Sequence, residues 1–255
     1  MLAIERLSSI RELLNKNDSV TVADLSKLFN VTEETIRRDL ERIIKSDSSV
    51  QRVHGGAYKI KTFDHEAPYQ LRETLLVEEK ARMAGQGLRL LAEGDTIMLD
   101  SSTSALYLAK AIKSAGIRLC IITNSLRISL ELSDCTHISL IMTGGSYRAA
   151  SQSFVGYATT AALSGLHADK AFVSCSGLHE RYGLTDNSES EAQVRRRMLL
   201  NSDLQYLLVD SDKFSLSKIH HISSLQGIQA ILTNKEPIGE LKMVLEREGI
   251  RIIVC

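Results

Sequence analysis

Two adjacent arginines near the start of a short predicted helix form the first arrangement with recognisable chemistry. Residues 31–40 read VTEETIRRDL. Thr32 is a favourable N-cap residue, and the two glutamates after it lie in the first turn, where carboxylates face the positive end of the helix dipole. A guanidinium can bond O6 and N7 of guanine together, so Arg37 and Arg38 suit base reading in a DNA major groove.

The periodicity of this helix separates an inward stripe from an outward face. Ile36, Leu40 and Ile43 recur at spacings of four and three, which places them on one side of a helix. The outward side carries Thr35, Arg38 and Arg42, with Arg37 beside them. A solvated surface helix would show the same pattern, so these residues alone leave both interpretations open.

A second arrangement lies at the ends of apolar runs farther along the chain. One run ends at Asp100, and a predicted helix then opens with Ser101, Ser102, Thr103 and Ser104. Hydroxyls and free N–H groups at a helix start form an anion site, although such serines also serve as plain caps. Small or polar residues follow the next runs: Asn124 and Ser125, Gly144 and Gly145, Ser176 and Gly177, and Asp210 with Lys213. Because ligands bind beyond the carboxyl ends of parallel strands, we expect these loops to converge.

The elements that position the arginines are predicted to be a support helix, a second helix and a β-hairpin. Residues 2–16 have a helical apolar stripe, and Thr21 with Asp24 resembles a capping box for the next helix. Residues 50–54 are a short β-prone run before two glycines, which predicts the wing of a winged helix. Arg52 on this run contacts a phosphate or is a plain solvated arginine, and its sequence context does not distinguish the two.

The elements behind the second arrangement alternate between strands and helices. Apolar runs that predict buried strands lie at 96–99, 119–123, 138–142, 171–174, 206–209, 228–232 and 250–254. Helical patterns lie at 105–114, 126–132, 157–163, 191–200 and 238–248. This alternation predicts an α/β fold class with a mainly parallel sheet covered on both faces. Residues 58–75, which include Pro68 and show no sustained period, predict a linker.

Composition excludes several classes of protein. The chain has 255 residues, of which 44% are hydrophobic, and its net charge is +0, so a cationic patch must be local. Residues 35–61 carry seven basic residues against three acids. We expect no membrane span and no signal peptide, and hence a cytoplasmic protein. The four cysteines are widely spaced, which favours free thiols and predicts no metal site.

The chain resembles the DeoR-type bacterial transcriptional regulators over most of its length. In residues 5–57 the resemblance is carried by Arg6, Ile10, Leu14, VTVADLSKLFNVTEETIRRDL and QRVHGGA. Residues 77–255 resemble the family's sensor domain, which is similar in fold to ribose-phosphate isomerases and CoA-transferases. The matching stretches are EGDTIMLDSSTSALYLAKAI, ITNS, TGG, FVG, DKAFVSCSGL, GLTDNSESEAQVRRRM and LVDSDKF. Some members have glycine at the position of Ser102 and lysine at that of Arg195.

The resemblance implies two sets of binding residues. The predicted DNA-binding residues are Thr32, Glu34, Thr35, Arg37, Arg38, Arg42, Arg52 and His54. The family's sensor binds a phosphorylated sugar or a related intermediate, and the implied effector-binding residues are Asp100, Ser101, Ser102, Thr103, Ser104, Asn124, Gly145, Glu191 and Lys213. The serine loop would hold the phosphate, and Asp100, Glu191 and Lys213 would hold the sugar hydroxyls or carbonyl.

The alternative function is that of a sugar-phosphate isomerase. Isomerisation needs a base next to a carbonyl, usually a carboxylate. The run SCSGLHE after the fourth strand offers only His179 and Glu180, so we expect no catalytic residues, no cofactor and no enzyme activity. A DNA-binding head joined to a sensor instead predicts a switch, in which a metabolite changes DNA affinity by roughly 1–3 kcal/mol.

The sequence therefore predicts three parts: a winged helix-turn-helix at 1–57, a linker at 58–75 and an effector-sensing α/β domain at 76–255. The predicted function is a sequence-specific transcriptional regulator, a repressor of a carbohydrate catabolic operon controlled by a phosphorylated sugar. One winged helix reads few base pairs, so we expect a homodimer or homotetramer on a double-stranded operator.

Overall fold

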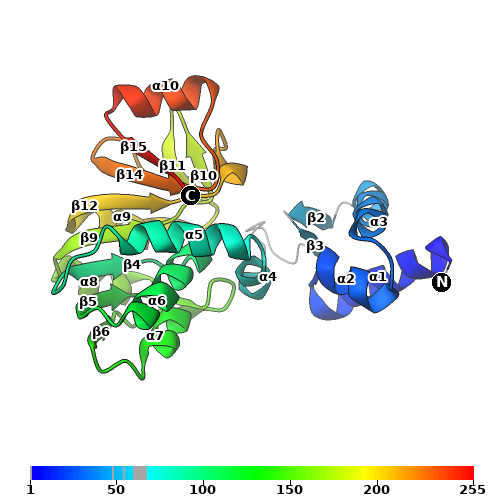
Figure 1. Ribbon diagram of the computed structural model, residues 1–255, viewed down its shortest axis with the longest axis horizontal. Helices are drawn as coiled ribbons and strands as arrows, with labels where there is room; N and C mark the ends of the chain where they lie inside the picture. The colour runs from blue at the N-terminus through cyan, green and yellow to red at the C-terminus, as the bar shows by residue number, and fades with distance from the viewer. Residues whose placement is uncertain (1, 48, 54, 60–67) are drawn as a thin grey trace. The chain divides into compact units, whose positions relative to one another are not determined.

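The chain folds into two compact units (Figure 1). The computed structural model describes residues 2–47, 49–53, 55–59 and 68–255. The first unit, Met1–Val77, is called the N-terminal unit, and the second, Glu78–Cys255, the C-terminal unit. Each has its own core.

The N-terminal unit is a winged helix, as predicted. Its helices are α1 (Ala3–Asn17), α2 (Val22–Phe29) and α3 (Glu33–Ser46). Its antiparallel sheet has the order β1 (Ser19–Thr21), β3 (Gly56–Lys59) and β2 (Val50–Val53). The last two strands form the wing. His54 and Ser48 lie outside the described residues.

Local chemistry sets the ends of these helices. Thr21 Oγ1 accepts a hydrogen bond from the Asp24 N–H at 3.0 Å, and Thr32 Oγ1 accepts one from the Thr35 N–H at 3.3 Å. Between α2 and α3, Asn30 adopts a left-handed conformation with φ of 50°, which asparagine tolerates better than most residues. The apolar stripe of α3 is buried in a core with Ile10, Leu14 and Leu25, so the predicted inward face of this helix is confirmed.

The segment predicted as a linker, 58–75, contains regular structure. Strand β3 continues to Lys59, and a helix, α4 (Tyr69–Thr74), begins directly after Pro68. Tyr69 is fully buried and Leu71 nearly so. The sequence did not reveal α4 because six residues are too few for a helical period to repeat.

The C-terminal unit is built on a parallel sheet, as predicted. Seven described strands have the order β15-β14-β12-β9-β4-β5-β6, and all of their pairings are parallel. They are β4 (Thr96–Leu99), β5 (Leu119–Thr123), β6 (Ile138–Met142), β9 (Ala168–Val173), β12 (Ser202–Leu208), β14 (Ile228–Thr233) and β15 (Arg251–Val254). The sequence placed the starts of β9 and β12 too late, because the polar pairs Asp169–Lys170 in β9 and Ser202–Asp203 in β12 interrupt the apolar pattern.

Helices cover both faces of this sheet. They are α5 (Val77–Leu88), α6 (Thr103–Ala115), α7 (Leu126–Leu132), α8 (Tyr157–Ser164), α9 (Glu189–Leu200) and α10 (Gly239–Arg247). Apolar residues of α8, α9 and α10 share one core with the sheet. On the other face, a Cβ added to Gly87 of α5 would lie 3.2 Å from Leu108 of α6 and 3.7 Å from Leu232 of β14, so α5 packs closely there. In Figure 1, α5, α6 and α7 lie in front of the sheet.

Two smaller antiparallel sheets and a short 3₁₀ helix accompany the large one. One sheet pairs β7 (Ser146–Arg148) with β8 (Ser153–Val155). The other has the order β10 (Gly177–His179), β11 (Gly183–Asp186) and β13 (His220–Ser223), and the 3₁₀ helix is η1 (Ser211–Lys213). None was predicted, because strands of three or four residues show too little alternation.

The strand order locates a switch point. The first strand of the large sheet, β4, has β5 on one side and β9 on the other. The chain therefore adds strands on one side of β4 before it continues with β9 on the other side. In open α/β sheets, ligands bind at such a point, beyond the carboxyl ends of the strands, which here are β4 and β9. Among the helices described, none is long and apolar enough to cross a membrane.

Candidate functional site

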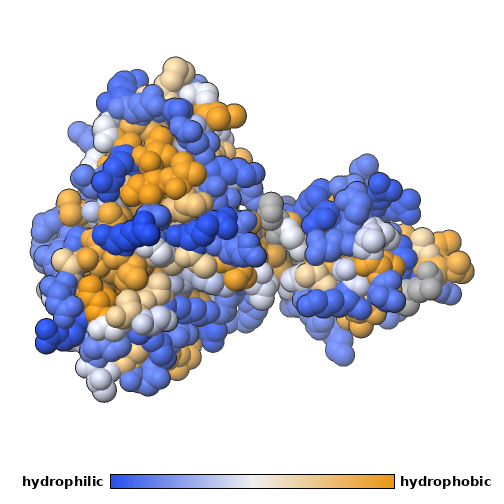
Figure 2. Space-filling view, viewed as in Figure 1, coloured by the Kyte–Doolittle hydropathy of each residue, from blue (hydrophilic) through white to orange (hydrophobic). Residues whose placement is uncertain are grey.

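The outward face of α3 is polar and exposed. Of the residues predicted there, Thr32, Glu34, Arg37, Arg38 and Arg42 are exposed, while Thr35 is half-buried. Figure 2 shows mainly hydrophilic surface over α3. The helix thus presents cations outward from a rigid, capped start, the geometry that major-groove reading requires.

Carboxylates of the same surface hold the arginines. Arg37 Nη2 lies 2.7 Å from Glu33 Oε2, and Arg38 Nε lies 3.3 Å from Glu34 Oε1. Because water reaches these pairs, each contributes little to stability and its arginine can exchange the carboxylate for another anionic partner.

The wing is joined to α3 by a third ion pair. Arg52 Nη1 on β2 lies 3.0 Å from Glu41 Oε1 on α3. Both residues line a shallow cleft between α3 and the wing, together with Arg37, Val53 and Gly56. Of the predicted residues, Arg37 on the helix and Arg52 on the wing therefore belong to one continuous surface.

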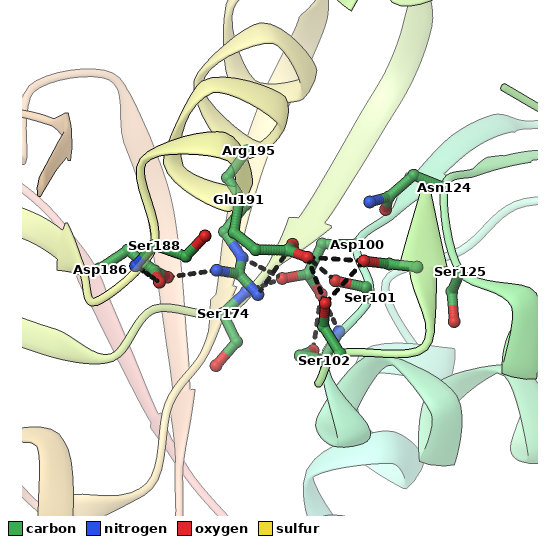
Figure 3. A network of polar contacts seen from close by, with 12 residues as sticks. Asp100, Ser101, Ser102, Asn124, Ser125, Ser174, Asp186, Ser188, Glu191 and Arg195 are labelled. Atoms are coloured by element: carbon green, nitrogen blue, oxygen red, sulfur yellow. Dashed lines mark hydrogen bonds and ion pairs between the residues drawn. The ribbon is translucent and has the colours of Figure 1, made fainter. Parts of the chain in front are cut away.

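At the switch point of the C-terminal unit, Asp100 joins the ends of two strands (Figure 3). It follows β4, and its Oδ2 accepts a hydrogen bond at 3.0 Å from the N–H of Ser174, which follows β9. Its Oδ1 accepts from the N–H and Oγ of Ser102 at 3.1 and 2.6 Å. Asp100 is only 1% exposed.

Arg195 lies at the centre of this network (Figure 3). From α9, its Nε lies 2.7 Å from Asp100 Oδ2, its Nη1 bonds Asp186 at the end of β11, and its Nη2 lies 3.8 Å from Glu191 Oε2. Burial by itself would lower the pKa of Arg195, but Asp186, Asp100 and Glu191 outweigh it and raise the pKa well above the ordinary value. Arg195 therefore stays charged and holds three carboxylates together.

Three serine hydroxyls surround Glu191. Ser151 and Ser153 donate to its Oε1, both at 2.6 Å, and Ser101 donates to its Oε2 at 2.8 Å. Ser151 lies in the turn between β7 and β8, and Ser153 opens β8. The carboxylate of Glu191 is thus satisfied by the protein, and it holds the β7–β8 turn to α9.

Lys213 is partly exposed, and the fully buried Asn124 has an acceptor atom that no described donor occupies. Lys213 Nζ donates to Ser174 Oγ at 3.1 Å and lies 3.3 Å from Asp210 Oδ2, yet its side chain remains 27% exposed. Asn124 donates from Nδ2 to the Phe154 carbonyl at 2.9 Å. Its Oδ1 is buried without a hydrogen-bond partner among the described residues.

The hydroxyl-rich start of α6 divides into two roles. Ser102 is the N-cap of α6, since its Oγ accepts from the Ala105 N–H at 3.1 Å, so the plain-cap interpretation applies to Ser102. Thr103 and Ser104 lie in the first turn, where backbone N–H groups have no partner within the helix.

Gly145 does not join this network. It has a φ of 121°, and an added Cβ would lie 2.1 Å from Thr159 Oγ1 and 2.9 Å from the Val155 carbonyl. Glycine is therefore required at this position for packing against α8.

Five members of the network were not among the predicted binding residues: Ser151, Ser153, Ser174, Asp186 and Arg195. The resemblance had marked Arg195 only as a position where some family members have lysine. Arg195 had a signal, because it lies four residues after Glu191 and so on the same side of a helix. The serines had no such signal, since only the fold brings the β7–β8 hairpin to Glu191 and the residue after β9 to Asp100.

Cys175 lies next to this site as a buried thiol. Burial raises its pKa from 9.0 to about 12, so it stays neutral near pH 7. All four cysteines are free. Within the described ranges, no group of three or more His, Cys, Asp or Glu residues is arranged to hold a metal ion.

Sequence comparisons place the chain among known regulators. A family profile described as the DeoR C terminal sensor domain matches residues 76–235, and one described as the DeoR-like helix-turn-helix domain matches residues 6–63. The uncharacterized HTH-type transcriptional regulator YulB of Bacillus subtilis (strain 168) is 39% identical over 234 residues, which are 92% of this chain and 90% of YulB. The chain belongs to the DeoR family of transcriptional regulators.

A second relative of this DeoR-family regulator has a name that states what it regulates. A lactose phosphotransferase system repressor of Staphylococcus epidermidis is 32% identical over 243 residues, 94% of this chain and 95% of the repressor. These relatives are named as regulators of transcription and not as enzymes. Among solved structures, ribose 5-phosphate isomerase A from Methanocaldococcus jannaschii matches 54% of each chain at 17% identity with a TM-score of 0.39, so the match spans about half of that isomerase.

Arg38→Ala tests the DNA-binding face of this regulator. Loss of one base-reading guanidinium is expected to weaken binding by about 1–3 kcal/mol to a duplex that the wild type selects from a random-sequence library. Binding is measured by fluorescence anisotropy, with exposed Arg89→Ala, in the turn directly after α5, as the matched control. An equal loss on selected and unselected duplexes would instead make Arg38 a phosphate contact.

Arg195→Met tests the buried network. Removal of the guanidinium leaves Asp100, Asp186 and Glu191 buried without their cation, which is expected to lower the free energy of unfolding of the C-terminal unit by about 3–5 kcal/mol. Urea unfolding at pH 7 measures this loss of unfolding free energy. Arg195→Lys keeps the charge and is expected to lose less, whereas full stability of the Met variant would contradict the role given to Arg195.

Cys175 gives stability a pH dependence. The pKa of Cys175 is about 12 in the folded protein and an ordinary 9.0 in the unfolded chain, so the unfolded chain ionises first as pH rises. The contribution of the neutral thiol to the free energy of unfolding is therefore complete below pH 9 and is lost as pH rises toward 12. Between pH 8 and pH 10, the wild type is expected to lose about 1.4 kcal/mol more unfolding free energy than Cys175→Ala. Urea unfolding at both pH values measures the difference, and equal losses would show that the thiol ionises in the folded protein.

Proposed function

We propose that this DeoR-family regulator represses a carbohydrate catabolic operon and that a phosphorylated sugar bound in the C-terminal unit relieves the repression. The name of the lactose phosphotransferase system repressor supports the sugar operon and the sign of the effect. The winged helix supports recognition of a double-stranded operator.

The observation that carries the effector proposal is the polar network at the switch point between β4 and β9. A sugar phosphate needs donors and acceptors for several hydroxyls and a cation or helix start for its phosphate. Lys213, the first turn of α6 and the unpartnered Oδ1 of Asn124 supply these groups. We infer that they contact the effector.

The carboxylates receive a different role from the one expected from the sequence. Asp100 and Glu191 are nearly closed to water, and protein donors already occupy both oxygens of each. We therefore assign them to holding the site in shape. This also favours binding over isomerisation, since a general base must reach the substrate's proton.

We further propose that the protein acts as a homodimer or homotetramer. A single winged helix contacts one half-site, and two copies related by a two-fold axis match an operator with two half-sites.

A panel of sugar phosphates tests the effector. A compound that binds only the folded protein at about 100 times its Kd adds about 2.7 kcal/mol of stability, so differential scanning fluorimetry is expected to detect one member that raises Tm. The same compound is expected to release the protein from its selected duplex and to remain unconsumed. Consumption of the compound would support the enzyme alternative, and a panel without any shift would contradict the sugar-phosphate proposal.

Lys213→Met then tests the site itself. Loss of the ammonium is expected to weaken the effector-induced Tm shift and the release of DNA, while DNA binding without effector stays at the wild-type level. Exposed Lys235→Met is the matched control. A Lys213→Met variant with a full response would remove Lys213 from the effector site.

A further inference from the structure

The core of the N-terminal unit contains an ion pair between α1 and α3. The buried stripe of α1 consists of Arg6, Ile10 and Leu14, and that of α3 includes Asp39. Arg6 Nε donates to Asp39 Oδ2 at 2.5 Å, and the two side chains are only 9% and 3% exposed. Each helix thus brings one charge into an otherwise apolar contact.

This pair differs from the other ion pairs of α3. In the Arg37–Glu33 and Arg38–Glu34 pairs, the side chains are 43–72% exposed. Water can replace either partner there, and the pairs can open when DNA arrives. Arg6 and Asp39 have no such exchange available, because opening their contact would leave two charges in an apolar core.

Stability alone does not account for such a pair. Apolar side chains of similar volume stabilise a core as well as a buried ion pair or better. The ion pair restricts how α3 is rotated against α1. The apolar contacts of Ile10 and Leu14 with α3 tolerate small rotations of the helix, whereas a guanidinium and a carboxylate form hydrogen bonds only in a narrow range of geometries.

The rotation of α3 that this ion pair fixes determines where the outward side chains of the helix point. Asp39 directly follows Arg38, and Thr35 and Arg42 lie within four residues of it on the same helix. A rotation of α3 that left the apolar stripe buried would turn these side chains away from their base pairs. We propose that Arg6 and Asp39 are positioning residues, which fix the rotation of α3 and thereby the sequence specificity of DNA binding.

The test separates specificity from stability in the full-length protein. The double variant Arg6→Met/Asp39→Leu replaces the pair by apolar side chains of similar size, and it is expected to keep the wild-type Tm and the wild-type affinity for an unselected pool of random-sequence duplexes. Its affinity for the duplex selected by the wild type is expected to fall by about tenfold. The ratio of the two affinities, measured by fluorescence anisotropy, is a readout that a purely structural pair would not change.

Two further variants complete the experiment. Arg6→Lys keeps the cation without the planar guanidinium, so its ratio is expected to fall by less than that of the double variant. The control, Lys170→Met/Asp95→Leu, removes an ion pair of the C-terminal unit whose side chains are 12% and 13% exposed, and it is expected to leave the ratio unchanged.

A wild-type affinity ratio in the folded double variant would overturn the proposal. If the double variant does not fold, Arg6→Lys decides alone, and a wild-type ratio there overturns the proposal equally. The inference rests on the proposed assignment of the outward face of α3 to DNA, which Arg38→Ala tests separately. A loss in Arg38→Ala with no loss in the Arg6 variants would reject only the positioning role.

Discussion

The burial of one guanidinium among three carboxylates is the constraint on which the C-terminal unit depends. Arg195 from α9 binds Asp100 at the end of β4 and Asp186 at the end of β11, so it connects the large sheet to a small one. Three buried carboxylates are tolerated only when a cation and hydrogen-bond donors satisfy them. The arrangement of the strand ends that carry Asp100 and Asp186 therefore depends on a helix that lies outside both sheets.

The two units use buried charge in related ways. In the N-terminal unit, Arg6 and Asp39 join two helices inside an apolar core. In the C-terminal unit, Arg195 joins strand ends through several carboxylates. The cations that face outward, such as Arg38 and Lys213, are instead held by contacts that water can reach. Buried pairs thus set the geometry, and exposed pairs remain free to exchange partners.

Apolar periodicity predicted the winged helix and the parallel sheet because burial on one side of an element is a local property. The same reasoning missed the starts of β9 and β12, the short strands and α4, whose residues are too few or too polar to show a period. Topology placed Asp100 and Lys213 at one end of the sheet. It could not place Ser151 and Ser153, because their approach to Glu191 depends on how the β7–β8 hairpin folds back.

The polar network of the C-terminal unit is assembled from segments that are far apart along the chain, since Asp100, Ser151, Glu191 and Lys213 all contribute. The N-terminal unit, by contrast, is complete at Val77. At a synthesis rate of about 5–20 residues per second, the ribosome needs roughly 10–35 seconds to make the remaining 178 residues, Glu78–Cys255. The N-terminal unit can therefore fold on a nascent chain well before the network around Arg195 forms. A newly made chain completes its winged helix first and its buried charge network last.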